Sequence, residues 1–253
     1  MTSPSQDRRA TPTIGTWLTL NSVSVAEVLA DAAFDWLCID MEHSPTDYAE
    51  AQAMIMAIQG RGKKAFVRVG ENNPRIIKRV LDAGAQGIIV PLVNTAEDAR
   101  RAVAATRYPP RGTRGVGLAR AQAYGFDFEG YRDTRSHDLT VIAQIEHIEA
   151  VKNLESILEI DGIDGTFIGP YDLSGSLGMP GDWSHPLVQS ALADYETTAR
   201  RYDKRIGAHV IEPDPEAVRQ KMARGYDFIA YSLDAMLLGT AARDHLQTIR
   251  AVP

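Results

Sequence analysis

Apolar residues along the chain fall into two alternating kinds of run. Short, nearly continuous apolar runs have the length and the branched side chains of buried strands. The stretches between them place apolar residues three and four positions apart, as amphipathic helices do. The predicted strands are 14–20, 36–40, 65–69, 87–90, 139–146, 165–168, 206–211 and 228–231. The predicted helices are 23–33, 47–59, 74–83, 95–105, 150–158, 187–201, 215–224 and 235–250.

This alternation gives about eight strand–helix units at a spacing of roughly 25–30 residues, which is typical of a (β/α)8 TIM barrel of the α/β class. A doubly wound open sheet is the alternative fold, but the Gly-x-Gly-x-x-Gly loop expected after its first strand is missing. We therefore predict one catalytic barrel domain over residues 14–253, preceded by a polar, disordered lead-in at 1–13. The connection 106–138 is too long for a simple loop, and such loops are usually functional or carry a small helix.

Composition removes several classes of function. The net charge of -6 and the pI near 5.5 argue against a nucleic-acid partner. Cys38 is the only cysteine and lies in an apolar run, so a buried structural thiol is expected and a disulfide within the chain is not. No apolar run approaches the length of a membrane span, and residues 1–13 lack the apolar core of a secretory signal. We expect a cytoplasmic protein.

Two acidic residues stand where neighbouring strands end. Gln144 and Glu146 point to one face of their strand by its period of two, and Asp172 follows the next strand. The C-terminal ends of barrel strands meet at one mouth, where catalytic groups gather. Two carboxylates there can bind a divalent cation, and oxygen ligands favour Mg²⁺ or Mn²⁺. The alternative is a pair of solvated carboxylates or of arginine partners.

Two further residues near this mouth carry acid–base and charge chemistry. His43 follows the second strand within Asp40-Met41-Glu42-His43, where carboxylates can raise its pKa, and it is the candidate general base. Arg68 ends the apolar third strand, where an arginine is costly unless it meets an anion. That anion is either a substrate carboxylate or enolate, or an internal partner at Asp40 or Glu42, and both can hold.

The positions of the lysines bear on whether a Schiff base could form. A Schiff-base enzyme needs a desolvated lysine inside the barrel near its mouth. Lys63 and Lys64 open their strand at the opposite end, and the other lysines considered (Lys78, Lys152, Lys204 and Lys221) lie on predicted helices or at their ends. An imine mechanism is therefore disfavoured, and a metal ion is the expected electron sink. The basic loop 107–115 is better explained as a proline-stiffened, solvated rim than as a phosphate clamp.

Together, these motifs resemble the HpcH/HpaI aldolase family, which includes metal-dependent class II pyruvate aldolases such as 4-hydroxy-2-oxoheptanedioate aldolase. The resemblance spans residues 14–248. It rests on Asp40-x-Glu42-His43, Arg68, Arg107-Tyr108-Pro109-Pro110-x-Gly112-x-Arg114-Gly115, Gln144-Ile145-Glu146 and Gly169-Pro170-Tyr171-Asp172-Leu173-Ser174.

The resemblance implies a (β/α)8 barrel that forms a homohexamer, a trimer of dimers, with the last helix exchanged between subunits. It implies that Glu146 and Asp172 hold the metal ion, for which Co²⁺ and Zn²⁺ are candidates besides Mg²⁺ and Mn²⁺. Gln144 and the backbone at Tyr171 and Asp172 would contact the pyruvate end of the substrate.

The resemblance also implies catalytic roles. His43 would accept a proton, Arg68 would stabilise the transition state, and Asp82 would raise the basicity of the histidine. Asp82 ends a helix at the far end of its own barrel, so that role would have to act across a subunit interface.

Three aromatic side chains bear on the acceptor pocket. Tyr171 replaces the alanine of some members and His209 replaces an apolar residue, and the role of His209 stays open. Trp17, in the first strand, either contacts the acceptor or only packs.

The expected reaction is the reversible cleavage of a 4-hydroxy-2-oxo acid into an aldehyde and pyruvate or hydroxypyruvate, with the enolate stabilised by the metal. The alternatives are an acyl-CoA lyase of the citrate lyase β or malyl-CoA lyase type, and a non-catalytic barrel that binds a 2-oxo acid. The sequence does not identify the aldehyde, whose pocket is built from loops such as 119–128.

Overall fold

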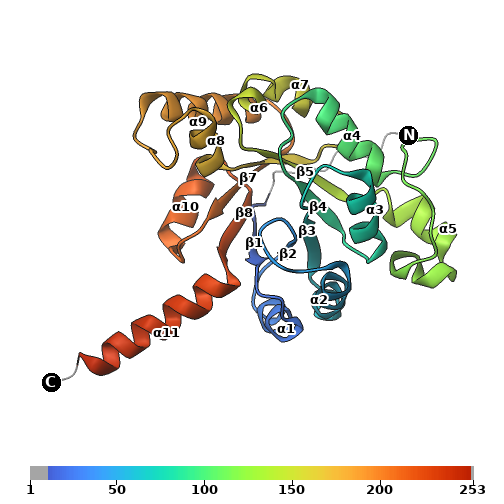
Figure 1. The fold of residues 1–253 in the computed structure, drawn as a ribbon, viewed down its shortest axis with the longest axis horizontal. Coiled ribbons are helices and arrows are strands. Elements are labelled where there is room, and N and C mark those ends of the chain that lie inside the picture. The colour runs from blue at the N-terminus through green and yellow to red at the C-terminus, as the bar shows by residue number, and fades with distance from the viewer. Residues whose placement is uncertain (1–10, 252–253) are drawn as a thin grey trace.

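The computed structural model describes residues 11–251, and residues 1–10 and 252–253 lie outside the description. Eight parallel strands pair in chain order and close into a barrel with helices around it (Figure 1). The predicted (β/α)8 fold is therefore confirmed. The strands are β1 (Thr13–Leu18), β2 (Trp36–Asp40), β3 (Lys64–Arg68), β4 (Gly87–Val90), β5 (Thr140–Ile145), β6 (Gly165–Ile168), β7 (Arg205–Val210) and β8 (Phe228–Leu233).

The surrounding helices begin at residues that satisfy their first free N–H groups. Asp47 and Thr95 each form a capping box with the third helical residue, and Asn73 and Asp214 cap helices that open on proline. The helices are α1 (Val23–Asp31), α2 (Tyr48–Gly60), α3 (Pro74–Asp82), α4 (Ala96–Thr106), α6 (Ile148–Lys152), α7 (Leu154–Leu158), α8 (Pro170–Ser176), α9 (Pro186–Ala199), α10 (Pro215–Ala223) and α11 (Asp234–Arg250).

Several sequence-based boundaries differ from the structure by one or two residues, and the helix α8 was not predicted. β1 begins at Thr13, so the predicted lead-in loses its last residue to a strand, and the part that lies in 1–10 is outside the described residues. The helix predicted at 150–158 is two short helices that meet at Asn153. The long connection carries the short helical segments η1 (Arg120–Gly125), α5 (Phe128–Gly130) and η2 (Tyr131–Arg135), as its length indicated.

Two layers of apolar side chains build the core. One fills the space between the strands and the helices, and the other fills the interior of the barrel. Room for the large aromatics of the inner layer comes from glycines on neighbouring strands: a Cβ on Gly15 would lie 2.1 Å from the Trp36 ring, and one on Gly87 2.1 Å from Phe66. Trp36 stacks on Phe228 with ring centroids 4.2 Å apart, so these rings plug the barrel interior.

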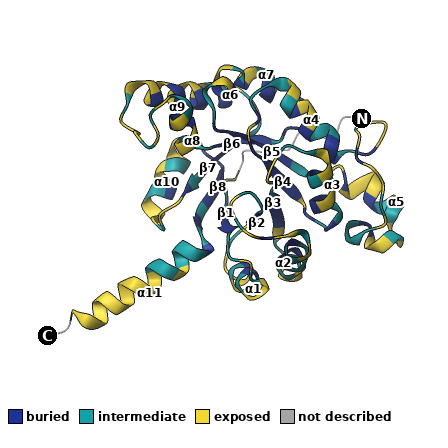
Figure 2. Ribbon diagram, viewed as in Figure 1, coloured by how far each residue is buried: buried dark blue, intermediate teal, exposed yellow. Residues whose placement is uncertain are grey.

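The last helix, α11, leaves the barrel instead of covering it. It projects from the end of β8, and its outer half is exposed, as Figure 2 shows. Leu238, Leu246 and Ile249 on this helix are 50–69% exposed. Within residues 11–251, no helix combines the length and the apolar character that crossing a membrane would require.

Candidate active site

The Asp40 carboxylate organises the turn that follows β2. It is 1% exposed and accepts two hydrogen bonds from its partner on β3, at 2.9 Å from Arg68 Nε and 2.6 Å from Nη2. The backbone N–H groups of Glu42 and His43 donate to its Oδ1 at 3.0 and 3.3 Å. One buried carboxylate thus positions both the arginine and the backbone of the predicted general base.

Arg68 lies among acidic and aromatic groups at the end of β3. Its Nη1 is 3.2 Å from Glu42 Oε2, so the predicted internal ion pairs form with both Asp40 and Glu42. Its guanidinium carbon lies 4.5 Å from the centroid of the Trp17 ring. Burial alone would lower the pKa of Arg68, but the hydrogen bonds and charge of Asp40 raise it above its usual value. The side chain is a fixed cation that retains 16% exposure toward the mouth.

Glu42 is a carboxylate with an unusual affinity for a proton. Burial raises its pKa to about 7, and the nearby charge of Glu146 adds to that shift, while Arg68 opposes it. The two glutamates therefore lie close enough to repel each other. A bound cation would relieve this repulsion, because it offsets negative charge where two carboxylates crowd together.

Glu146 follows β5 and is held by two donors. The backbone N–H of Leu92, just past β4, donates to Oε1 at 2.7 Å, and the side-chain amide of Gln144 donates to Oε2. Leu92 has φ +52°, in the left-handed region, so its backbone takes a strained conformation where it meets the carboxylate. Glu146 is 5% exposed and is oriented before any ligand binds.

Asp172 lies in α8, the short helix that follows β6 at the same end of the barrel. A Cβ on Gly169, the residue before this helix, would lie 2.9 Å from Glu146 Cβ and 3.3 Å from its Oε2. The start of α8 therefore packs directly against Glu146, and only a glycine fits between them. Asp172 is exposed in the first turn of α8.

The donor set at this mouth fits a catalytic divalent cation. Gln144 Oε1 is buried and, within residues 11–251, accepts no hydrogen bond, so this amide oxygen is available to a cation beside Glu146. The described residues contain no cluster of three His, Cys, Asp or Glu side chains arranged as metal ligands. A catalytic divalent site uses few protein carboxylates and leaves its other positions to water and substrate oxygens.

His43 and Tyr171 stand at the open edge of the mouth. The His43 side chain is 70% exposed, and its Nε2 lies 3.8 Å from Glu42 Oε2. Tyr171 is 58% exposed and packs edge-on against Trp183, with centroids 6.1 Å apart. Both side chains can meet a substrate that enters from solvent.

Trp17 and His209 lie deeper, inside the barrel. Trp17 is 3% exposed, and its Nε1 is buried without a hydrogen-bond partner among the described residues. His209 lies 5.8 Å from Trp17 by ring centroids, and its Nε2 is 2.9 Å from the Ser232 carbonyl oxygen. Burial lowers the pKa of His209 to about 4, so the ring is neutral at pH 7.

Asp82 is the one predicted site residue that the chain does not bring to its own mouth. It ends α3 on the side where the strands begin, and its Oδ1 lies 2.7 Å from Arg114 Nη2. Arg114 is 1% exposed, donates to the Tyr131 hydroxyl at 3.0 Å and lies over the Tyr108 ring. Within one subunit, Asp82 anchors the long connection 107–138 to the barrel.

Sequence reasoning overlooked two contributors to the site. The Leu92 N–H is a backbone group in a loop, and no residue type signals its direction. Asp40 was a candidate at the mouth and a possible partner of Arg68, but its hydrogen bonds to the backbone of Glu42 and His43 were not predicted, although the order Asp40-x-Glu42-His43 allows an Asx-type turn.

The closed barrel and the ionisable groups at its mouth define a (β/α)8 enzyme, and comparison with known proteins gives its class. The family model for HpcH/HpaI aldolase/citrate lyase matches residues 13–241, and the chain belongs to this family. The chain is an aldolase-type lyase.

Named relatives and a solved structure support this assignment over nearly the whole chain. The chain is 42% identical to the 2-keto-3-deoxy-L-rhamnonate aldolase of Klebsiella pneumoniae, covering 88% of this chain and 84% of that protein. It is 38% identical to the 2-dehydro-3,6-dideoxy-6-sulfogluconate aldolase of Pseudomonas putida, covering 96% and 94%. A crystal structure of a family member from Burkholderia cenocepacia superposes with a TM-score of 0.91 at 38% identity, covering 97% and 98%.

Proposed function

We propose that this protein reversibly cleaves a 4-hydroxy-2-oxo acid of the 3-deoxy sugar-acid type into an aldehyde and pyruvate or hydroxypyruvate. The observation that carries the proposal is the convergence of Glu146, Gln144, Arg68 and His43 at one mouth, where the buried amide oxygen of Gln144 accepts no hydrogen bond among residues 11–251. The related aldolases named above act on 2-keto-3-deoxy acids, which are substrates of this class.

Glu146 and Asp172 are the proposed ligands of a divalent ion, Mg²⁺ or Mn²⁺ in the first place. Such an ion, when bound, supplies a Lewis acid that offsets the negative charge developing on the 2-oxo oxygen, an effect worth several kcal/mol. Co²⁺ and Zn²⁺ remain candidates, because a site of two carboxylates and open positions accepts each of them.

The chain's own groups would orient the substrate and move the proton. Gln144 and the backbone at the start of α8 hold the pyruvate end. His43 takes the proton of the 4-hydroxyl as the C3–C4 bond breaks and the aldehyde leaves, a contribution of roughly 10²–10⁴-fold for a well-placed base, and protonation of the remaining enolate at C3 gives pyruvate. Arg68, fixed by Asp40, stabilises the developing enolate charge without having to reorganise. Trp17 lies beneath Arg68 and limits how far the substrate can enter.

Metal depletion is the direct test of this proposal. Protein treated with EDTA and shown to be metal-free should lose cleavage of a 2-keto-3-deoxy acid and recover it on addition of Mg²⁺ or Mn²⁺. Glu146→Gln and Asp172→Asn should each weaken metal binding in calorimetry. Glu149→Gln, an exposed carboxylate on α6, is the matched control and should bind as the parent does. Full turnover by verified metal-free protein would refute the metal mechanism.

The alternative functions have distinct outcomes in the same assays. An acyl-CoA lyase would cleave malyl-CoA and leave 2-keto-3-deoxy acids untouched. A non-catalytic barrel would bind Mg²⁺ and pyruvate without turnover. A panel of aldehydes offered with pyruvate or hydroxypyruvate would then identify the acceptor.

We also propose that the protein assembles as a hexamer, a trimer of dimers, through exchange of α11. The projection of α11 from the barrel and its exposed apolar residues support this assembly (Figure 1). Light scattering should give six times the chain mass of 27.7 kDa, and deletion of residues 237–253 should reduce the assembly. A monomer of unchanged activity would contradict it.

In such a hexamer, Asp82 would act on the His43 of a neighbouring subunit. The cytoplasmic location stays a prediction.

A further inference from the structure

A polar groove lies at the end of the barrel opposite the mouth. Its volume is about 890 Å³, which is in the range of small-molecule sites. It lies between the start of β3, the end of α3 and the long connection between α4 and β5. The aromatic plug formed by Trp36, Phe66 and Phe228 lies between this groove and the mouth, so the two are separate spaces.

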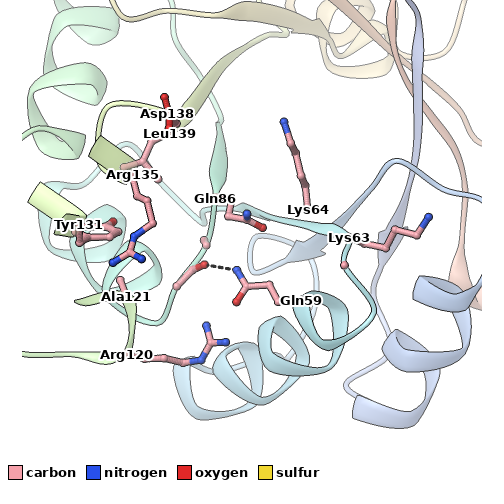
Figure 3. Close-up of a pocket in the computed structure, with 13 residues that line it drawn as sticks. Gln59, Lys63, Lys64, Gln86, Arg120, Ala121, Tyr131, Arg135, Asp138 and Leu139 are labelled. Carbon is pink, nitrogen blue, oxygen red and sulfur yellow. Dashed lines mark hydrogen bonds between the residues drawn. The ribbon is translucent and has the colours of Figure 1, made fainter. Parts of the chain in front are cut away.

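The groove collects positive charge on a protein that is acidic overall. Four cationic side chains line it, Lys63, Lys64, Arg120 and Arg135, against one carboxylate, Asp138. Figure 3 shows the lysines on one side and the arginines on the other, with Gln59 and Gln86 between them. The chain as a whole has a net charge of -6, so the excess of cations in this groove is a local feature and does not reflect the average composition.

Most of this positive charge has no internal partner. Among residues 11–251, Lys63 and Lys64 form no ion pair, and Lys64 is exposed although it belongs to a barrel strand. Arg120 donates from Nη1 to the Ala83 carbonyl at 3.1 Å, and no described carboxylate pairs with it. Burial lowers the pKa of Arg120. Arg135 is the exception, because its Nη2 lies 2.6 Å from Asp127.

Two hydrogen bonds fix the shape of the groove and leave other N–H groups of its lining side chains free. Gln59 donates to the Gly84 carbonyl at 2.8 Å, and Arg120 lies so close to Gly84 that a Cβ there would be 2.1 Å from Nη1. Gly84 has φ +107°, which favours glycine. These contacts satisfy the Ala83 and Gly84 carbonyls just after α3 and fix the Arg120 guanidinium, whose other N–H groups stay available to a ligand.

We propose that this groove binds a small molecule with two or more anionic groups, phosphates or carboxylates, at a site distinct from the aldol centre. Cations on facing walls select an extended anion that reaches both, and a single charge would reach only one. Lysine ammonium groups and an arginine fork are suited to phosphate and carboxylate alike. This inference does not depend on the proposed aldol reaction.

Calorimetric titration of the metal-loaded, full-length protein tests the site. Fructose 1,6-bisphosphate provides two separated phosphates, and tricarballylate provides three carboxylates. At least one should bind, with an affinity that falls as salt is added. Binding of only the bisphosphate, or only the tricarboxylate, assigns the ligand class, and binding of both assigns any extended polyanion.

Lys64→Met should weaken binding by about tenfold or more, because it removes one of the two lysine charges on that wall without breaking any contact between described residues. Arg120→Met should weaken it similarly, and its melting temperature shows whether the loss of the α3 contact disturbs the fold. Lys152→Met, an exposed lysine on α6, is the matched control and should leave binding unchanged.

Lysine acetylation read by mass spectrometry locates the bound anion. The bound anion should protect Lys63 and Lys64 from acetylation and leave Lys152 reactive. No heat with either probe up to about 5 mM would overturn the proposal. So would binding that survives Lys64→Met and protects neither groove lysine, since the anion would then lie elsewhere.

Discussion

His209 should make the stability of this protein depend on pH in a way that a single substitution removes. The ring lies inside the barrel, with Nε2 2.9 Å from the Ser232 carbonyl oxygen, and burial lowers its pKa to about 4. The charge of Arg68 lowers it further, while the Ser232 contact and Asp40 partly oppose the shift. In the unfolded chain the same side chain has a pKa near 6.5.

Between pH 6.5 and pH 4, His209 is therefore protonated in the unfolded chain and neutral in the folded chain. Stability rises with pH wherever the unfolded state binds more protons, so the folded protein is penalised as pH falls through this window. The penalty is negligible at pH 7.5. At pH 5, a shift from 6.5 to about 4 corresponds to about 2 kcal/mol.

The measurement is urea unfolding of wild type and His209→Leu at pH 7.5 and pH 5, in the presence of EDTA. The variant loses the hydrogen bond to Ser232, which gives an offset that does not vary with pH. The difference in unfolding free energy between the two proteins should shift by about 2 kcal/mol in favour of the variant on going to pH 5. Parallel pH profiles would show that His209 is not held neutral, and would refute the argument from burial.

Three other substitutions test contacts described above, each by thermal or urea unfolding. Arg114→Met leaves Asp82 unpaired and should cost about 3–5 kcal/mol, whereas Arg111→Met, an exposed arginine on the same connection, should cost little; equal melting temperatures would contradict the buried ion pair. Arg68→Met leaves the buried Asp40 carboxylate without its cation and should lower both stability and turnover. Arg68→Lys should not restore turnover, because lysine cannot donate the two N–H groups that Asp40 accepts; rescue by lysine would argue against this two-point contact. Gly87→Ala places a methyl group 2.1 Å from Phe66 and should cost about 1–3 kcal/mol, while Gly60→Ala, which meets nothing within 4 Å, should be neutral or stabilising; no difference between the two would contradict the packing of the plug.

Periodicity was sufficient to predict the barrel because each strand–helix unit repeats the same burial problem. The strand β4 was predicted at its observed bounds, and α3 began at Pro74 as its proline indicated. The division at Asn153 was missed because the apolar spacing continues across it. The helix α8 was missed because its sequence was interpreted only as a motif. Local pattern reports which face is buried and carries little information on where a short helix stops.

The site was predictable where side chains carry it and unpredictable where the backbone does. Gln144 and Glu146 share a face through simple alternation, and the structure joins them by a hydrogen bond. The Arg68 ion pairs followed from the cost of burying a charge. The Leu92 N–H and the close approach of Gly169 to Glu146 depend on how separate loops meet, which no single stretch of sequence encodes.

The aromatic plug has a consequence for traffic through the barrel. Since Trp36, Phe66 and Phe228 close the interior from below, molecules reach the reacting groups from one side only. In a pocket open at one end, the substrate that binds deepest must bind first, and the product formed there must leave last. Product-inhibition patterns in steady-state kinetics should then show a compulsory order of substrate binding and product release, set by the closed lower end of the barrel.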